Sequence, residues 1–146
     1  MKTISGKPPS GPFEIIDHTA DIGIRVHGAD LKETFANAAL AISGLVTDAG
    51  KVRQSLHRDL EVTANGEEAL LVAWLNELLY VFDAENILFS RFDIRDLTPT
   101  RLRARAYGET VDPSRHPMKM GIKAATYHRL KIEKGEHYTA RVIFDI

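Results

Sequence analysis

Apolar and polar residues alternate in several short stretches of this chain, and each such stretch predicts a strand with one buried face. Residues 22–27 place isoleucine or valine at every second position, and residues 100–107 alternate leucine and alanine with arginine. Further strands are predicted at residues 13–16, 56–63, 87–94, 122–132 and 137–146. The last two are expected to form a hairpin around Lys134-Gly135.

Two longer segments repeat apolar residues every three or four positions, which is the spacing of an amphipathic helix. The first begins after Asp30, a good N-cap with Glu33 at the capping-box position, and continues for about four turns to Leu45. The second covers residues 67–82 and is the most hydrophobic helical segment of the chain. Its tryptophan, Trp74, is expected in the core rather than in a cofactor site.

The predicted order is strands, helix, strand, helix and then a run of four strands. This order lacks the regular alternation of a doubly wound parallel fold and favours the α+β class. We expect a compact two-layer domain in which two main helices pack on a mixed, largely antiparallel sheet. The single domain covers residues 13–146 and includes a long loop at residues 109–121. Residues 1–12, with three prolines and two glycines, are predicted to form a flexible tail.

The composition agrees with one domain and excludes several classes of protein. The chain has 146 residues, of which 44% are hydrophobic and 27% charged, so it can bury a sizeable core. It has no cysteine, which excludes a disulfide scaffold, a thiolate zinc site and a cysteine nucleophile. The net charge is -1, so any contact with RNA has to come from a local patch. No apolar run is long enough for a membrane span and no signal peptide is evident, so we expect a cytoplasmic protein.

Carboxylates are the first candidates for chemistry, and they lie near both ends of the chain. Asp21 begins a predicted strand, in a loop that also offers Asp17 and His18, and Asp145 is followed directly by the chain-terminal carboxylate of Ile146. The side-chain carboxylate of Asp145 and the terminal carboxylate belong to consecutive residues, and two acidic groups held so close repel each other unless they are hydrated or share a cation. Oxygen ligands of this kind suit calcium or magnesium. Alternatively, the aspartates cap turns and the terminal carboxylate is simply hydrated.

Other motifs that carry chemistry are scarce. The six histidines form no helical His-x-x-x-His pair, and the chain lacks a glycine-rich phosphate loop and a nucleophile elbow. Arg101, Arg103 and Arg105 share one face of a predicted strand. This row can bind a phosphate backbone or, in the interpretation that we favour, pair with acids on neighbouring strands. Lys119 and Lys123 flank Gly121 and offer point charges for a phosphate group.

Taken together, four separated groups of residues resemble the archease family. The first is His-Thr-Ala-Asp-Ile-Gly at 18–23 with Leu-Val-Thr-Asp at 45–48, and the second is Ala-Trp-Leu-Asn-Glu-Leu-Leu-Tyr at 73–80 with Asp83. The third is His-Pro at 116–117 with Ile-Lys-Ala-Ala-Thr-Tyr-His at 122–128, and the fourth is the terminal Phe-Asp-Ile at 144–146. The resemblance covers nearly everything from residue 13 to residue 146.

The resemblance implies an accessory factor rather than a stand-alone enzyme. Archeases act with the RtcB-type RNA ligase, which joins a 2′,3′-cyclic phosphate or 3′-phosphate end of RNA to a 5′-hydroxyl. They promote guanylylation of the ligase and allow multiple turnover, in tRNA splicing or RNA repair. RNA and GTP would then be reached through the ligase. The family fold that the resemblance implies is a compact α+β domain with a metal site.

The resemblance also assigns roles to individual residues. It implies a metal site made of Asp21, Asp145 and Ile146, the last through its terminal carboxylate. The expected metal is a hard divalent cation, with calcium as the first choice and magnesium or manganese as alternatives. The lysine required for ligase activation corresponds to Lys123.

Two alternatives from other functional classes stay open at this point. One is a metal-dependent enzyme that acts by itself on RNA phosphates, although the residues offer no obvious general base or nucleophile. The other is a chaperone or RNA-binding module that uses the row formed by Arg101, Arg103 and Arg105.

Overall fold

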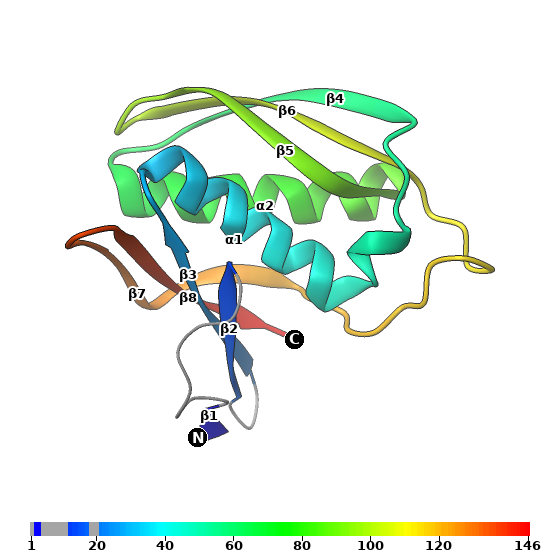
Figure 1. Ribbon diagram of the computed structural model, residues 1–146, viewed down its shortest axis with the longest axis horizontal. Coiled ribbons are helices and arrows are strands. Elements are labelled where there is room, and N and C mark those ends of the chain that lie inside the picture. Colours follow the sequence, from blue (N-terminus) through cyan, green and yellow to red (C-terminus); the bar gives the residue numbers. More distant parts are fainter. Residues whose placement is uncertain (1, 4–11, 18–20) are drawn as a thin grey trace.

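In the part of the chain that the structure describes, two helices lie between two antiparallel sheets and form three layers with them (Figure 1). The structure is a computed structural model that describes residues 2–3, 12–17 and 21–146. The larger sheet has the order β1-β2-β3-β8-β7 and the smaller one β4-β6-β5. The strands are β1 (Lys2–Thr3), β2 (Phe13–Asp17), β3 (Asp21–Gly28), β4 (Leu56–Thr63), β5 (Ile87–Leu97), β6 (Arg101–Thr110), β7 (Ala124–Lys134) and β8 (Tyr138–Asp145). The helices are α1 (Leu31–Val46), α2 (Glu67–Glu85) and the short η1 (Ala49–Lys51).

The α+β class and the two main helices are confirmed, but the expectation of one sheet in two layers is wrong. The strand pairs form two separate sheets, and each covers one side of the helical layer. The apolar residues of α2 explain why a second sheet covers the helices. These residues are spread around the helix and need burial on more than one side. The buried ones are Leu70, Leu71, Val72, Trp74, Leu75, Leu78, Leu79 and Val81.

The helix ends and the tryptophan follow the sequence pattern. Asp30 caps α1 by accepting a hydrogen bond from the amide of Glu33 at 2.8 Å, and the Glu33 side chain accepts one from the amide of Ala29 at 3.1 Å. Trp74 is fully buried and donates its indole N–H to the carbonyl oxygen of Phe35 at 3.1 Å. Its expected place in the core is therefore confirmed. No helix in the described part of the chain is long and apolar enough to cross a membrane.

The predicted loop at residues 109–121 begins too early, because β6 continues to Thr110. Gly108 is a reason for the error, since a glycine after an alternating run usually ends a strand. Here it lies opposite Phe89 beside a bulge in β5, and a β-carbon on Gly108 would come within 1.8 Å of the Leu88 carbonyl oxygen. The glycine therefore permits a close approach of two backbones inside the sheet. The connecting loop is residues 111–123.

The tail predicted at residues 1–12 lies largely outside the described residues. Within it, Lys2–Thr3 form β1 and pair with Asp17 and Ile16 of β2. The flexibility of the rest of this segment stays a prediction.

An amide side chain from α2 covers the start of β7, which is an edge strand of the larger sheet. Asn76 accepts a hydrogen bond from the Ala125 amide at 2.8 Å and donates one to the Ala125 carbonyl at 3.2 Å. Ala125 pairs with Phe144 of β8 on its other side. Asn76 therefore takes the place of a neighbouring strand at this position and ties α2 to the segment that follows Lys123.

We predict that Asn76→Ala lowers the free energy of unfolding by about 1–3 kcal/mol, because it leaves two buried backbone groups without their partner. Urea denaturation measures this loss, and amide hydrogen exchange should show faster exchange at Ala125. Glu77→Ala is the matched control on the same helix. An unchanged exchange rate at Ala125 in the Asn76 variant would contradict the assigned role.

Candidate functional site

The two ends of the domain meet where β3 begins and β8 ends. Asp21 is paired directly with Asp145 in antiparallel register. Side chains of such a pair project from the same face, with their β-carbons about 5 Å apart. The next pair, Ile22 and Phe144, points into the core and is buried. The two carboxylates therefore share the outer face of the larger sheet, away from the helices.

The end of the loop that precedes β7 brings Lys123 to the same place. The Lys123 amide donates a hydrogen bond to the carbonyl oxygen of Asp145 at 2.8 Å, and the following residue, Ala124, pairs with Asp145. The Lys123 and Asp145 residues are exposed, and Ile146 has 41% of its surface exposed. Asp21 is half-buried, with its Oδ1 atom shielded from solvent. The four residues singled out by the resemblance thus lie at the adjacent ends of three neighbouring strands: Asp21 begins β3, Asp145 and Ile146 are at the end of β8, and Lys123 directly precedes β7.

An apolar contact lies beside the carboxylates on the same outer face. Gly23 and Ile143 form the next outward pair after Asp21 and Asp145, and Ile143 is only 3% exposed. A β-carbon on Gly23 would lie 3.4 Å from the Ile16 β-carbon and 3.7 Å from Cγ1 of Ile143, so both isoleucine side chains pack beside the glycine. Apolar surroundings on one side reduce the screening of charge, which strengthens the interaction of a carboxylate with another ion.

The donor set at this place fits a hard cation. Like charges directly opposite each other in a sheet are destabilising, and a divalent ion between two carboxylates removes that repulsion. Carboxylate oxygens are the ligands that calcium and magnesium prefer. Within the described ranges, no three side chains of His, Asp or Glu form a metal-binding group. The expected site has only two side-chain carboxylates and relies on the chain terminus for its third. His18 and the side chain of Asp17 lie outside the described part.

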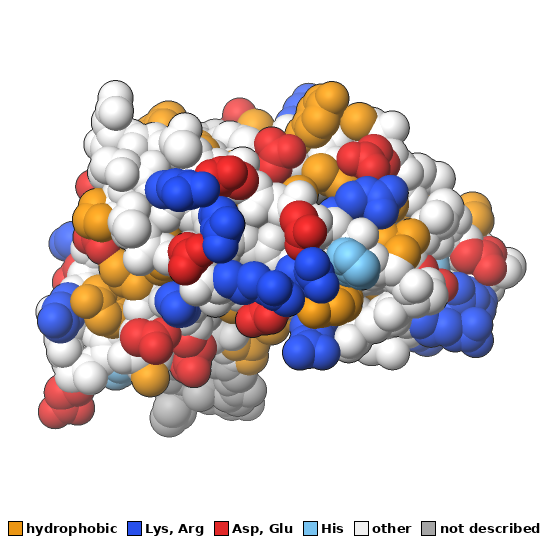
Figure 2. All heavy atoms as spheres, turned by 90° about the horizontal axis from the view of Figure 1, so that it is seen from above, with side chains coloured by type: hydrophobic (Ala, Val, Ile, Leu, Met, Phe, Trp, Pro, Cys, Tyr) orange, Lys and Arg blue, Asp and Glu red, His pale blue; other side chains and the backbone are white. Residues whose placement is uncertain are grey.

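Arg101, Arg103 and Arg105 each form an ion pair with an acidic residue of a neighbouring strand. The partners are Glu61 for Arg101, Asp96 for Arg103 at 2.6 Å and Asp59 for Arg105 at 2.7 Å. Figure 2 looks onto this side of the molecule and shows basic and acidic side chains intermixed over the three-stranded sheet. The hydrogen bond from Arg105 holds the pKa of Asp59 below its ordinary value. The preferred interpretation of this row, a solvated and paired sheet face, is confirmed.

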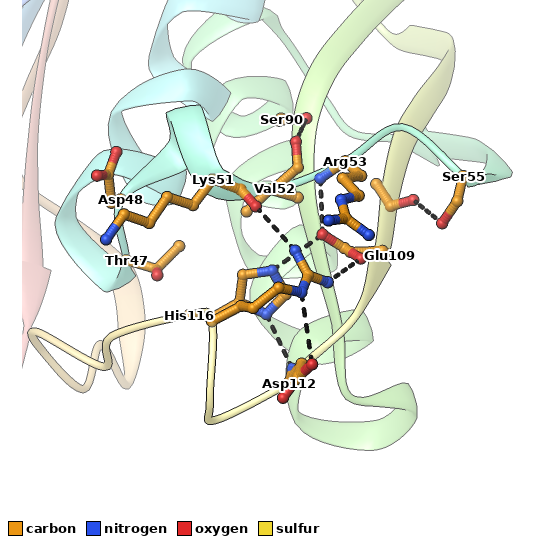
Figure 3. A network of polar contacts seen from close by, with 12 residues as sticks. Thr47, Asp48, Lys51, Val52, Arg53, Ser55, Ser90, Glu109, Asp112 and His116 are labelled. Atoms are coloured by element: carbon orange, nitrogen blue, oxygen red, sulfur yellow. Dashed lines mark hydrogen bonds and ion pairs between the residues drawn. The ribbon is translucent and has the colours of Figure 1, made fainter.

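A buried polar network anchors the loop that leads to Lys123 (Figure 3). His116 is 1% exposed, and its Nε2 lies 3.0 Å from Oε2 of Glu109. The Asp112 amide donates to Nδ1 of His116 at 2.8 Å, so Nδ1 must carry a lone pair and Nε2 the proton. His116 is therefore neutral and donates to Glu109. The Arg53 amide also donates to Glu109, at 2.7 Å.

The surrounding donors keep Glu109 ionised although it is buried. The hydrogen bond from Arg115 has the largest effect, followed by those from the Arg53 amide and from His116, and together they lower the pKa of Glu109 to about 2. The same contact raises the pKa of Arg115. The charge of one buried carboxylate is thus balanced by a charged donor and two neutral donors.

Further hydrogen bonds hold the loop along the end of α1. The Thr47 hydroxyl donates to the carbonyl of Pro117 at 2.8 Å, and the Lys119 amide donates to the carbonyl of Val46 at 2.9 Å. The loop is thereby tied at His116, Pro117 and Lys119 before it reaches Lys123. No periodicity in the sequence marks Glu109 or Asn76 as anchoring residues. The nearest signal is an acid, an arginine and a histidine within eight consecutive residues, at 109, 115 and 116.

Comparison with known proteins shows which family has a similar sequence. Residues 13–146 match the archease protein family (MTH1598/TM1083). The chain is 42% identical over 139 residues to a protein named archease from Sulfurisphaera tokodaii, covering 92% of this chain and 98% of that one. The chain belongs to the archease family. An archease from Methanosarcina acetivorans is 40% identical over 139 residues, covering 92% of this chain and 95% of the other.

A solved structure agrees with the archease assignment. The solution structure of protein 1598 from Methanobacterium thermoautotrophicum superimposes with a TM-score of 0.81 and 38% sequence identity, and the match covers 92% of this chain and 99% of that one. The family resemblance and the α+β fold expected from the sequence are therefore confirmed. The roles of Asp21, Lys123, Asp145 and Ile146 stay predictions.

We predict that Glu109→Gln destabilises the protein at pH 7 and that the deficit shrinks on acidification. Glu109 has a folded-state pKa of about 2, below its ordinary value of 4.5, so its ionised form stabilises the fold above pH 4.5. That contribution is lost as the pH falls from about 4.5 to about 2. Urea denaturation of both proteins across this range measures the difference, with Glu133→Gln as a surface control. A deficit that does not change with pH would contradict this account.

Proposed function

We propose that the chain is a metal-binding accessory factor that activates an RtcB-type RNA ligase. In this role it promotes guanylylation of the ligase and multiple turnover, in tRNA splicing or RNA repair. The observation that carries the proposal is the register that pairs Asp21 with Asp145 while the Lys123 amide binds Asp145. These are the residues that the family resemblance marks as functional, and they converge although they are more than 100 residues apart at the extremes.

In this proposal Asp21, Asp145 and the terminal carboxylate of Ile146 hold one divalent cation. Calcium is the first choice because its flexible coordination accepts carboxylate ligands in many arrangements, and magnesium or manganese are alternatives. The cation neutralises the carboxylates and presents positive charge at the end of the sheet, where it can attract a phosphate group.

Lys123 has a separate task, because its backbone is bound to Asp145 while the residue is exposed. Its ammonium group can reach a phosphate of the nucleotide or of the RNA held by the ligase. The anchored loop at 111–123 and the Asn76 contact keep the backbone before and after Lys123 in place. The accessory protein in this way adds preorganised positive charge to the site of another enzyme.

We predict that Asp21→Asn, Lys123→Ala and Asp145→Asn each abolish ligase stimulation while the domain stays folded. The test compares single-turnover with multiple-turnover ligation, with and without this protein, and follows guanylylation of the ligase. Glu61→Gln on the far sheet is the control and should stimulate normally. Normal stimulation by all three site variants would contradict the proposal. RNA phosphate turnover by the isolated protein with Mg²⁺ or Mn²⁺ would instead favour a stand-alone enzyme.

We also predict that residues appended after Ile146 weaken cation binding and ligase stimulation, because they convert the terminal carboxylate into a neutral peptide group. Isothermal titration with Ca²⁺ measures the first effect and the ligation assay the second. A fusion of the same length at the N-terminus is the control. Full stimulation by the C-terminal fusion would exclude the terminal carboxylate as a ligand.

A further inference from the structure

Three basic residues lie side by side on the outer face of the larger sheet, on three neighbouring strands. Arg141 of β8 pairs directly with Arg25 of β3 on one side and with Lys131 of β7 on the other. We call Arg25, Arg141 and Lys131 the cationic row. Arg25 is four residues from Asp21 along β3, so the row lies about 13 Å from the paired carboxylates.

The charges of the cationic row are poorly balanced by acids. Glu14 lies 3.6 Å from Arg25, and Glu133 lies 3.4 Å from Lys131, at the two ends of the row. Arg141 stands between two cations and has no ion pair within the described part of the chain. Like charges directly opposite in a sheet are destabilising, so this arrangement costs folding free energy.

The other sheet shows how the same chain neutralises such a row. There, Arg103 and Arg105 have carboxylates at 2.6 and 2.7 Å, supplied by the strands on either side. Arg141 likewise lies on a strand with a neighbour on each side, but both residues directly opposite it are cations. An acidic residue in place of Arg25 or Lys131 would have removed the repulsion. The unbalanced row therefore points to an anion that binds from outside.

A bulge in β7 adds further basic character next to Lys131. Between the pairs at Thr126 and Lys131, β7 contains extra residues relative to β8, and among them His128 and Arg129 are exposed. Arg129 has a φ of 53°, in the left-handed region that residues other than glycine seldom adopt. Thr126 holds the bulge by donating to the Ile143 carbonyl at 2.8 Å and accepting from the His128 amide at 3.3 Å. Bulges of this kind change the direction in which side chains project from the strand.

We propose that the cationic row binds the phosphate backbone of single-stranded RNA. A row of like charges matches a ligand that repeats its own charge at regular intervals, as a nucleic-acid backbone does, whereas protein surfaces mix both signs. Neighbouring strands are about 4.8 Å apart, so the row spans about 10 Å and can contact successive phosphates. Arginine suits this ligand because its planar group donates two hydrogen bonds to one phosphate. The proposal does not depend on ligase activation, since it concerns the isolated protein.

The test measures fluorescence anisotropy of a labelled single-stranded RNA titrated with the full-length protein at several salt concentrations. With three phosphate contacts, the logarithm of the affinity should fall against the logarithm of salt concentration with a slope of about -2. Arg141→Gln should weaken binding about fivefold and reduce the steepness of the slope by about 0.7, which is the contribution of one phosphate contact. Arg103→Gln, which removes the same charge from the paired row, is the matched control and should bind as the unaltered protein does.

Stability provides an independent check on Arg141. Because its neighbours are cations, Arg141→Gln should leave the midpoint of thermal unfolding unchanged or raise it, so weaker RNA binding cannot be ascribed to unfolding. Lys131→Gln, at an exposed position, should weaken RNA binding in the same way.

Four results would overturn the proposal. They are the absence of RNA binding by the unaltered protein, unaltered binding by both cationic-row variants, and an equal loss in Arg103→Gln and Arg141→Gln. The fourth is displacement of RNA by another anion at equal charge concentration. Displacement by polyglutamate would mark the row as a surface for an acidic protein, and displacement by GTP would mark it as a nucleotide site.

Discussion

The antiparallel pairing of β3 with β8 is the interaction on which the rest of this structure depends. It joins the beginning of the domain to its end over eight consecutive residue pairs, from Asp21 with Asp145 to Gly28 with Tyr138. Its inward side chains form the surface on which α1 packs. Its outward side chains include Asp21 and Asp145 and two members of the cationic row, Arg25 and Arg141. A shift of one residue would move the isoleucines outward and the aspartates into the core, so the apolar pattern holds the register firmly.

The helical layer and the loop at 111–123 extend this constraint to β7. Asn76 of α2 binds the backbone of β7 from one side while β8 pairs with it from the other. The loop before β7 is held by Glu109 and His116 and by its contacts with the end of α1. Lys123 lies between these two anchors, on an exposed stretch whose backbone is nevertheless held at both ends. Hydrogen bonds therefore fix the backbone on both sides of Lys123 while the residue itself stays exposed.

The two sheets give arginines of similar sequence context opposite electrostatic surroundings. Both Arg103 and Arg141 lie in alternating strands with apolar neighbours, and both point away from the helices. Arg103 faces an acid across the strand pair, whereas Arg141 faces two cations. The electrostatic character of a strand residue is set by the strands beside it, since the partners directly opposite are closer than the next residues on the same face.

The sequence by itself determined the local elements and the residues worth testing. Apolar periodicity identified both helices and most strands. Asp30 caps α1 at the expected start of the helix, and the burial of Trp74 followed from the apolar residues around it in the sequence. The family motifs singled out Asp21, Lys123, Asp145 and Ile146. Tertiary structure decided what lies next to what. Periodicity shows which face of an element is apolar, but two sheets or one, and acid or cation as a neighbour, depend on pairings between distant segments. The meeting of Asp21 with Asp145, the contact of Glu109 with His116 and the isolation of Arg141 among cations are all consequences of strand order and loop path.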